Sequence, residues 1–147
     1  MKTYESHSPA ETEAIGAAFA KELNGGTVVA MYGGLGMGKT AFVRGMAIGR
    51  GLEAEVSSPT FALVHEYGGT PPLIHFDMYR VTGWEDLYST GFFEYIDMGC
   101  ILAVEWSENI EAALPSDAVR VSFVSKGDTD RCITISKGES DLENSGD

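Results

Sequence analysis

Cysteine is scarce in this 147-residue chain, which contains only Cys100 and Cys132. The two form no C-x-x-C pair and show no zinc-ligand spacing, which argues against a zinc site. Each lies in an apolar segment, so we expect both to be small, buried core residues. Such cysteine usage suits a reducing compartment, and we expect a cytoplasmic protein.

Basic residues and long apolar runs are also scarce. The chain has 10 lysines and arginines against 22 aspartates and glutamates, a formal net charge of −12. Because nucleic-acid binding requires basic side chains that neutralise phosphates, we expect no strong direct nucleic-acid binding by the chain alone. No apolar run approaches the length of a membrane span, and the first six residues carry no hydrophobic signal region, so we expect no membrane association.

The remaining composition is that of one globular domain. Hydrophobic residues make up 44% of the chain, which is enough for a proper core at this length. From residue 138 the sequence becomes acidic and rich in serine and glycine. We therefore expect a single domain over residues 1–137 and a disordered tail over residues 138–147.

Residues 33–40 read GGLGMGKT, a complete match to the phosphate-binding pattern G-x-x-x-x-G-K-[ST]. Glycines let the backbone curl so that successive N–H groups point at an anion. Lys39 adds a positive charge for the outer phosphates, and the Thr40 hydroxyl is placed to ligate Mg²⁺. The pattern predicts a bound nucleoside triphosphate with Mg²⁺.

The surrounding sequence supplies the strand and the helix that such a loop requires. Residues 27–32 are apolar and β-branched, as in a buried parallel strand, and residues 41–48 carry apolar residues at helical spacing. The other predicted elements are a helix that begins after the capping box at Ser8 and ends before residue 24, strands over 61–67 and 73–77, a less regular helical stretch over 84–96, and strands over 100–106, 119–124 and 131–135. The short connection after residue 67 implies an antiparallel hairpin. We predict a three-layer α/β sandwich whose central sheet is mostly parallel, with antiparallel hairpin strands added.

Two acidic residues are predicted at the carboxyl ends of strands, where open α/β sheets bind their ligands. Asp77 ends one strand and Glu105 ends another. A phosphate-bound Mg²⁺ usually takes one or two carboxylates, so both are candidate metal ligands beside Thr40. A turn or cap aspartate is the alternative for Asp77, and Glu105 is a candidate metal ligand, water-orienting group or both.

Other polar residues near these positions have competing interpretations. Ser58, Pro59 and Thr60 follow the loop unit where nucleotide hydrolases have switch segments, although a simple turn explains them nearly as well. Arg80 either neutralises phosphate charge or forms a surface ion pair. Packing is favoured over base stacking for both tryptophans, and structural roles are favoured for the three histidines: Trp84, Trp106, His7, His65 and His75.

Two further absences bear on the nucleotide base. No asparagine is followed by lysine, so the guanine-reading Asn-Lys-x-Asp signature is missing, and the chain has no glutamine to position water as in Ras. Adenine, or a base read loosely by backbone groups, is therefore favoured. No arginine-rich lid segment of the small phosphotransferases is visible either.

Four motifs, at residues 33–40, 58–61, 75–80 and 104–106, together resemble the TsaE (YjeE) family, bacterial ATPases required for making threonylcarbamoyladenosine in tRNA. The resemblance covers about residues 8–135 and implies a P-loop NTPase-like fold. It implies an ATPase that is slow alone and dependent on partners, with Lys39, Glu105 and Thr60 as its catalytic residues. The implied metal ligands are Thr40, Asp77 and Glu105. The implied ATP contacts are Pro9, Thr12, Leu35, Gly36, Met37, Gly38, Lys39, Thr40 and Arg131.

The resemblance also implies partners. Such proteins act on the TsaD and TsaB proteins rather than on tRNA directly, and ATP turnover would reset that complex through a switch-like change near Thr60. A small-molecule kinase and a nucleotide-binding regulator with little turnover are the alternatives. Gly34 departs from the family pattern, which usually has aspartate there.

Overall fold

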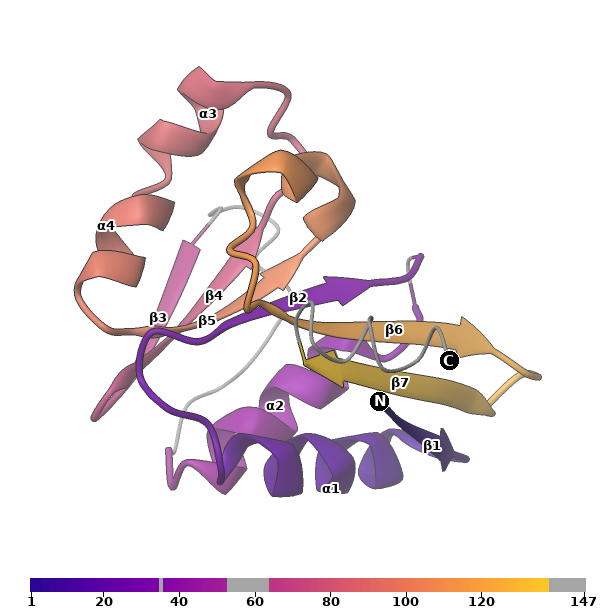
Figure 1. Cartoon of the computed structure of the whole chain (residues 1–147). Helices are drawn as coiled ribbons and strands as arrows, with labels where there is room; N and C mark the ends of the chain where they lie inside the picture. The colour runs from indigo at the N-terminus through magenta and orange to yellow at the C-terminus, as the bar shows by residue number, and fades with distance from the viewer. Residues whose placement is uncertain (35, 53–63, 138–147) are drawn as a thin grey trace.

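A mixed β-sheet forms the middle layer of this computed structural model, which describes residues 1–34, 36–52 and 64–137 (Figure 1). In this described part, seven strands lie in the order β1-β7-β6-β2-β5-β4-β3. The strands are β1 (Lys2–Ser6), β2 (Val28–Tyr32), β3 (Val64–Gly69), β4 (Pro72–Asp77), β5 (Ile101–Glu105), β6 (Val119–Ser125) and β7 (Arg131–Lys137). The helices are α1 (Pro9–Ala20), α2 (Lys39–Gly49), α3 (Trp84–Ser89), α4 (Phe92–Asp97) and the 3₁₀ helix η1 (Ser107–Ala113).

The four central strands β6, β2, β5 and β4 are mutually parallel. Antiparallel strands flank them, because β7 and β1 continue the sheet beyond β6, and β3 pairs with β4 as the predicted hairpin. The carboxyl ends of β2, β4 and β5 therefore meet at one edge of the sheet, and this edge positions the candidate site.

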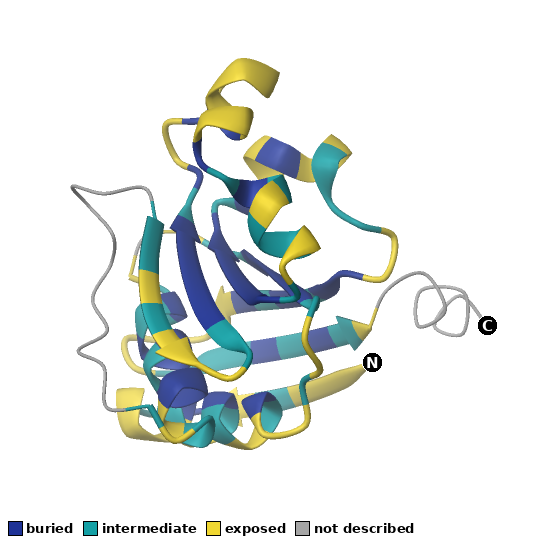
Figure 2. Cartoon of the chain, turned by 90° about the vertical axis from the view of Figure 1, so that its left-hand side faces the viewer, coloured by how far each residue is buried: buried dark blue, intermediate teal, exposed yellow. Residues whose placement is uncertain are grey.

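Alternation of side chains along the strands separates the core into two parts, one on each face of the sheet. The central strands are buried along most of their length (Figure 2). On one face, strand residues such as Met31 and Ile101 pack with Phe42 of α2. On the other face, strand residues such as Phe76 pack with Phe92 of α4. The fold is thus the predicted three-layer α/β sandwich, with α1 and α2 on one side and α3, α4 and η1 on the other.

Helices α1 and α2 approach so closely that their contact requires glycine. A Cβ atom on Gly45 would lie 2.0 Å from the Glu13 carbonyl oxygen, and one on Gly16 would lie 2.3 Å from the Phe42 carbonyl oxygen. Both distances are far below van der Waals contact, so any larger residue would push the helices apart. This packing brings the start of α1 beside the phosphate-binding loop.

Several elements differ from the sequence predictions. Strand β1 was not predicted, and the helical stretch over 84–96 is two short helices separated at Gly91, whose φ is 82°. Cys100 is buried as predicted, but the prediction for Cys132 is wrong, since Cys132 is only partly buried. Ile133 and Ile135 of β7 are buried in the core. Because side chains alternate along a strand, Cys132 points to the opposite face of β7.

Some predictions fall on the undescribed ranges, namely the first residues of the strand over 61–67 and the tail over 138–147. Within the described ranges, no helix is long and apolar enough to cross a membrane.

Candidate functional site

The phosphate-binding loop connects the end of β2 to the start of α2, as the sequence predicts. Its backbone uses left-handed conformations at three glycines, with φ of 144° at Gly33, 74° at Gly36 and 98° at Gly38. Gly38 is the N-cap of α2, and no described side chain caps that helix. The first N–H groups of α2 are therefore available to an anion in the concave loop, where the helix dipole favours negative charge.

Lys39 is folded back over this loop. Its Nζ donates to the Gly33 carbonyl oxygen at 2.7 Å and lies 4.6 Å from the centroid of the Trp106 ring. Only 4% of Lys39 is exposed, so the carbonyl and the aromatic face compensate a largely desolvated charge. A phosphate oxygen at the loop would find this charge already in place.

An uncommon backbone conformation of Trp106 places its ring beside Lys39. Among the described residues it is the only one other than glycine with a left-handed φ, which is 59°. The ring also contacts Tyr79, with centroids 5.0 Å apart. Trp106 thus has the packing role favoured by the sequence, but it packs on the loop lysine, a contact that sequence reasoning missed.

Asp77 and Glu105 lie side by side at the ends of β4 and β5, because they are register partners in the parallel pair. The Asp77 Oδ1 atom accepts a hydrogen bond from the Tyr79 N–H at 2.9 Å, so Asp77 also has the turn role that the sequence left open. Glu105 is 5% exposed, and its Oε2 lies 2.6 Å from Nε2 of the fully buried His75.

The His75–Glu105 contact was not anticipated from sequence. Only half of the signal lies in the sequence: His75 precedes Asp77 by two residues, so both share a face of the sheet, but the contact with Glu105 depends on the register of β4 with β5. A histidine on the ligand-binding edge is a candidate partner for the carboxylates there.

The chemistry of these donors fits Mg²⁺. Asp77 and Glu105 offer carboxylate oxygens and Thr40 offers a hydroxyl, which are the hard oxygen ligands that Mg²⁺ prefers. Among the described residues, no group of three or more His, Cys, Asp or Glu side chains is arranged to hold a metal ion. A metal at this edge would therefore depend on the Thr40 hydroxyl, on phosphate oxygens and on water, which is the usual mode of Mg²⁺ in nucleotide sites.

A pocket of about 150 Å³ lies beside the loop, between the start of α1 and the turn that joins β6 to β7. It brings together three of the predicted nucleotide contacts that are distant in sequence, Pro9, Thr12 and Arg131, with the loop residues Gly36 and Gly38. The other lining residues are Ser8, Ala41, Asp128 and Thr129.

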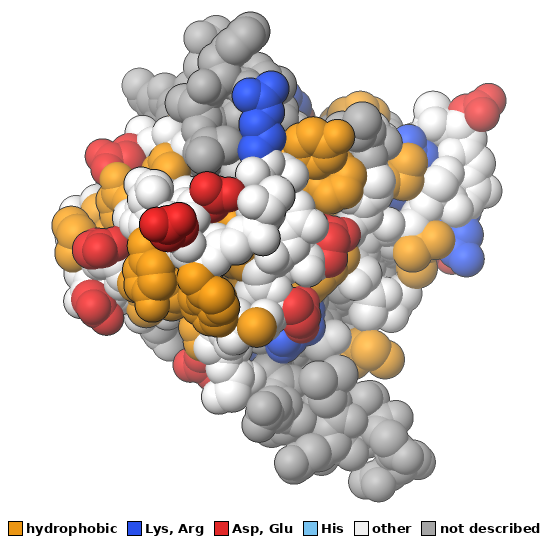
Figure 3. All heavy atoms as spheres, turned by 90° about the horizontal axis from the view of Figure 1, so that it is seen from above, with side chains coloured by type: hydrophobic (Ala, Val, Ile, Leu, Met, Phe, Trp, Pro, Cys, Tyr) orange, Lys and Arg blue, Asp and Glu red, His pale blue; other side chains and the backbone are white. Residues whose placement is uncertain are grey.

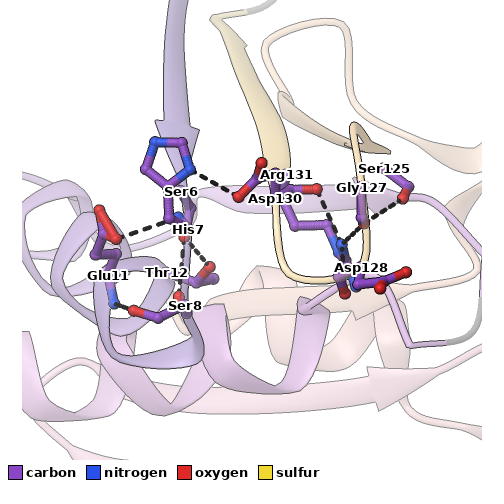
Figure 4. Close-up of polar contacts among 10 residues, drawn as sticks. All are labelled: Ser6, His7, Ser8, Glu11, Thr12, Ser125, Gly127, Asp128, Asp130 and Arg131. Atoms are coloured by element: carbon purple, nitrogen blue, oxygen red, sulfur yellow. Dashed lines mark hydrogen bonds and ion pairs between the residues drawn. The ribbon is translucent and has the colours of Figure 1, made fainter.

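Arg131 fixes the wall of this pocket. It donates to the carbonyl oxygens of Gly127 at 3.0 Å and Asp130 at 2.9 Å within its own turn (Figure 4). Its other terminal nitrogen donates to the Gly36 carbonyl oxygen at 3.2 Å. The arginine therefore ties the β6–β7 turn to the phosphate-binding loop.

The start of α1 forms the opposite wall. Ser8 caps the helix by accepting from the Glu11 N–H at 3.1 Å, and Thr12 hydrogen-bonds to Ser6 at 2.7 Å (Figure 4). The exposed His7 Nδ1 lies 2.8 Å from Asp130 Oδ1 of the β6–β7 turn, and the hydrogen bond to Asp130 raises the pKa of His7.

Other predicted site residues are not joined to this arrangement. Met37 is part of the loop, between Gly36 and Gly38, but its side chain packs against the core on the α2 face. Arg80 is exposed and forms no ion pair with any described residue. Leu35, Ser58, Pro59 and Thr60 lie outside the described residues, so their roles stay predictions.

The fold and the loop define a class, that of α/β proteins with a P-loop NTPase-like architecture. Comparison with known proteins narrows it, because the family model described as "Threonylcarbamoyl adenosine biosynthesis protein TsaE" matches residues 6–133. This chain therefore belongs to the TsaE family, whose members take part in the biosynthesis of threonylcarbamoyladenosine in tRNA.

Individual relatives agree with this assignment. The chain is 36% identical over 130 residues to the tRNA threonylcarbamoyladenosine biosynthesis protein TsaE of Treponema pallidum, covering 88% of this chain and 96% of that protein. It is 39% identical over 132 residues to the protein of the same name from Bacillus subtilis, covering 87% and 80%. The crystal structure of Bacillus subtilis YdiB matches with a TM-score of 0.80 and 31% identity, covering 97% of this chain and 89% of that one.

Proposed function

We propose that this chain binds ATP with Mg²⁺ at the loop over residues 33–40 and hydrolyses it in support of threonylcarbamoyladenosine synthesis. The observation that carries the proposal is the meeting of three features at one sheet edge. These are the glycine loop with its buried Lys39, and the neighbouring carboxylates of Asp77 and Glu105. Phosphoryl transfer needs positioning and charge stabilisation above all, and this edge offers both.

Each residue of the edge takes one task in this proposal. The N–H groups of residues 35–40 surround the phosphates, and Lys39 exchanges its bond to the Gly33 carbonyl for a phosphate oxygen. Thr40, Asp77 and Glu105 hold Mg²⁺, which when bound neutralises charge on the outer phosphates. Glu105 also orients the attacking water, and Thr60 reports the state of the γ-phosphate.

The adenosine end of ATP occupies the pocket beside the loop. Pro9 and Arg131 flank it from opposite walls, and Gly38 lets the nucleotide approach the backbone. Pro9 offers an apolar surface to a base, while the main-chain groups of the β6–β7 turn offer polar contacts. This arrangement supports recognition of the base by packing and backbone contacts, with little selectivity among bases.

The proposed partners are the TsaD and TsaB proteins rather than tRNA itself. The net charge of −12 disfavours direct tRNA binding and favours contact with a protein surface. On the side of α3 and α4, acidic side chains lie among exposed apolar ones (Figure 3). A surface of this kind supports a role in a protein assembly.

Lys39→Ala tests the nucleotide site. We expect the affinity for Mg²⁺-ATP, measured by calorimetry, to fall at least tenfold, because the variant loses the positive charge at the phosphates. Lys21→Ala, on the exposed end of α1, is the matched control and should bind as the wild type does.

ATP hydrolysis should then be measured with and without TsaD and TsaB. The proposal expects slow turnover alone and faster turnover with both proteins. Full ATP affinity in Lys39→Ala would remove the loop assignment, and absence of stimulation would remove the partner assignment.

A further inference from the structure

A line of hydrogen bonds crosses three neighbouring strands on the site's face of the sheet. It begins at Tyr67 on β3, whose hydroxyl lies 3.0 Å from Nδ1 of His75 on β4. It continues from His75 Nε2 to Glu105 Oε2 on β5, at 2.6 Å. His75 is fully buried and Glu105 nearly so, which makes this a desolvated polar network.

The direction of these hydrogen bonds follows from the chemistry of the groups. A carboxylate can only accept, so with Glu105 ionised the His75 Nε2 carries the proton and donates. In a neutral imidazole Nδ1 then has a free lone pair, and it accepts from the Tyr67 hydroxyl. Glu105 therefore sets the tautomer of His75, and the Tyr67 hydroxyl, which also lies 3.5 Å from Nδ1 of His65, holds the ring from the opposite side.

Apart from His65, which is the register partner of His75 on β3, the neighbours of this line along β4 and β5 are apolar. His75 occupies the same face of β4 as Leu73, and Glu105 the same face of β5 as Ile101 and Ala103, all core residues. A carboxylate so placed is costly unless it is well paired, and apolar residues of similar volume would often serve stability as well. We therefore attribute this line of hydrogen bonds to a role at the edge of the sheet where Glu105 lies, rather than to a contribution to stability.

We propose that His75 and Tyr67 are positioning residues that fix the orientation of the Glu105 carboxylate. His75 engages Oε2, which leaves the other oxygen for Mg²⁺ or for the attacking water. The inference rests on the proposed function, because it assigns Glu105 a task in ATP hydrolysis. Partners of this kind orient the groups that contact a metal or substrate, and their loss typically costs about 10–100-fold in activity or metal affinity.

Tyr67→Phe removes the hydroxyl and keeps the ring, so it is the mildest test. We expect kcat for ATP to fall about tenfold, with KM changed less than about twofold, because the phosphates and adenosine contact other residues. The Mg²⁺ concentration for half-maximal nucleotide binding should rise. Tyr95→Phe is the matched control, since the Tyr95 hydroxyl donates to Glu66 away from this edge, and it should keep wild-type values.

His75 variants separate positioning from mere packing. His75→Gln retains an N–H near the place of Nε2, whereas His75→Leu retains only the volume. We expect His75→Gln to keep several-fold more activity than His75→Leu at similar thermal stability. If His75→Leu does not fold, the comparison of Tyr67→Phe with Tyr95→Phe still decides.

A second measurement needs no nucleotide. Nitrogen NMR of the ring should show His75 as the Nε2–H tautomer in the wild type, because the Glu105 carboxylate accepts that proton. An Nδ1–H tautomer in the wild type would overturn the inference. A kcat of Tyr67→Phe equal to that of the wild type would also overturn the inference, but it would leave the proposed function intact. If the wild-type protein neither binds nor hydrolyses ATP, the proposed function is overturned as well.

Discussion

The two positively charged side chains at the loop, Lys39 and Arg131, have different kinds of contact partner. Lys39 has a carbonyl and an aromatic face as partners, and Arg131 has only carbonyl oxygens. Because neither is paired with a carboxylate of any described residue, that part of the chain neutralises neither positive charge. In the proposed function, the triphosphate of ATP supplies the negative charge that these two groups lack.

The pair of His7 and Asp130 is different, since it joins opposite charges when His7 is protonated and links the start of α1 to the β6–β7 turn. The hydrogen bond to Asp130, followed by its charge, raises the pKa of His7 above the ordinary 6.5. A raised folded-state pKa means that this contact contributes fully below pH 6.5 and is lost as the pH rises through the folded pKa. Proton NMR titration should show the raised pKa in the wild type and a clearly lower pKa in Asp130→Asn.

Asp128→Asn, in the same turn, controls for general loss of negative charge and should leave the His7 pKa nearly unchanged. An equal drop in both variants would mean that the turn's overall charge, rather than the 2.8 Å contact, causes the shift.

At the scale of elements, the packing of α1 on α2 sets the position of the pocket. Exposed helix positions usually gain about 1 kcal/mol when glycine becomes alanine. At Gly45 the added Cβ would lie 2.0 Å from backbone, a clash that no rotamer relieves. The clash outweighs the propensity, so the two helices must separate or the variant must unfold.

We therefore expect Gly45→Ala to lower the free energy of unfolding by about 3 kcal/mol or more, measured by urea denaturation. Gly83→Ala is the control, because a Cβ there meets nothing within 4 Å, and its effect should stay below about 1 kcal/mol. A neutral Gly45→Ala would contradict the close approach of the helices.

The sequence predicted the elements whose structure depends on residues close together in the chain. The loop, its strand and its helix follow from residues 27–48, and the Ser8 cap follows from four consecutive letters. Strand β1 escaped prediction because its polar residues form a strand only through pairing with β7, more than 120 residues away. The break at Gly91 depends on a left-handed turn, and the β4–β5 contacts depend on register, which a single sequence does not give.

At the scale of the whole molecule, charge decides which partners the chain can approach. Acidic and hydrophobic side chains share the surface seen in Figure 3. Among the exposed hydrophobic residues are Trp84 and Tyr88 of α3, each more than half exposed. Exposed aromatic residues are enriched at protein interfaces, whereas phosphate contacts need Lys and Arg. The two properties together favour a protein partner over tRNA.

We expect the isolated chain to show no saturable tRNA binding up to about 10 μM at roughly 0.15 M salt, where even non-specific binders need many phosphate contacts. Fluorescence anisotropy with labelled tRNA measures this directly. With TsaD and TsaB added, we expect the chain to join their complex more strongly with ATP than without it, and Lys39→Ala to lose that difference. Micromolar, salt-sensitive tRNA binding by the chain alone would contradict the charge argument. It would mean that the few basic residues of this acidic chain are enough to form a nucleic-acid-binding surface.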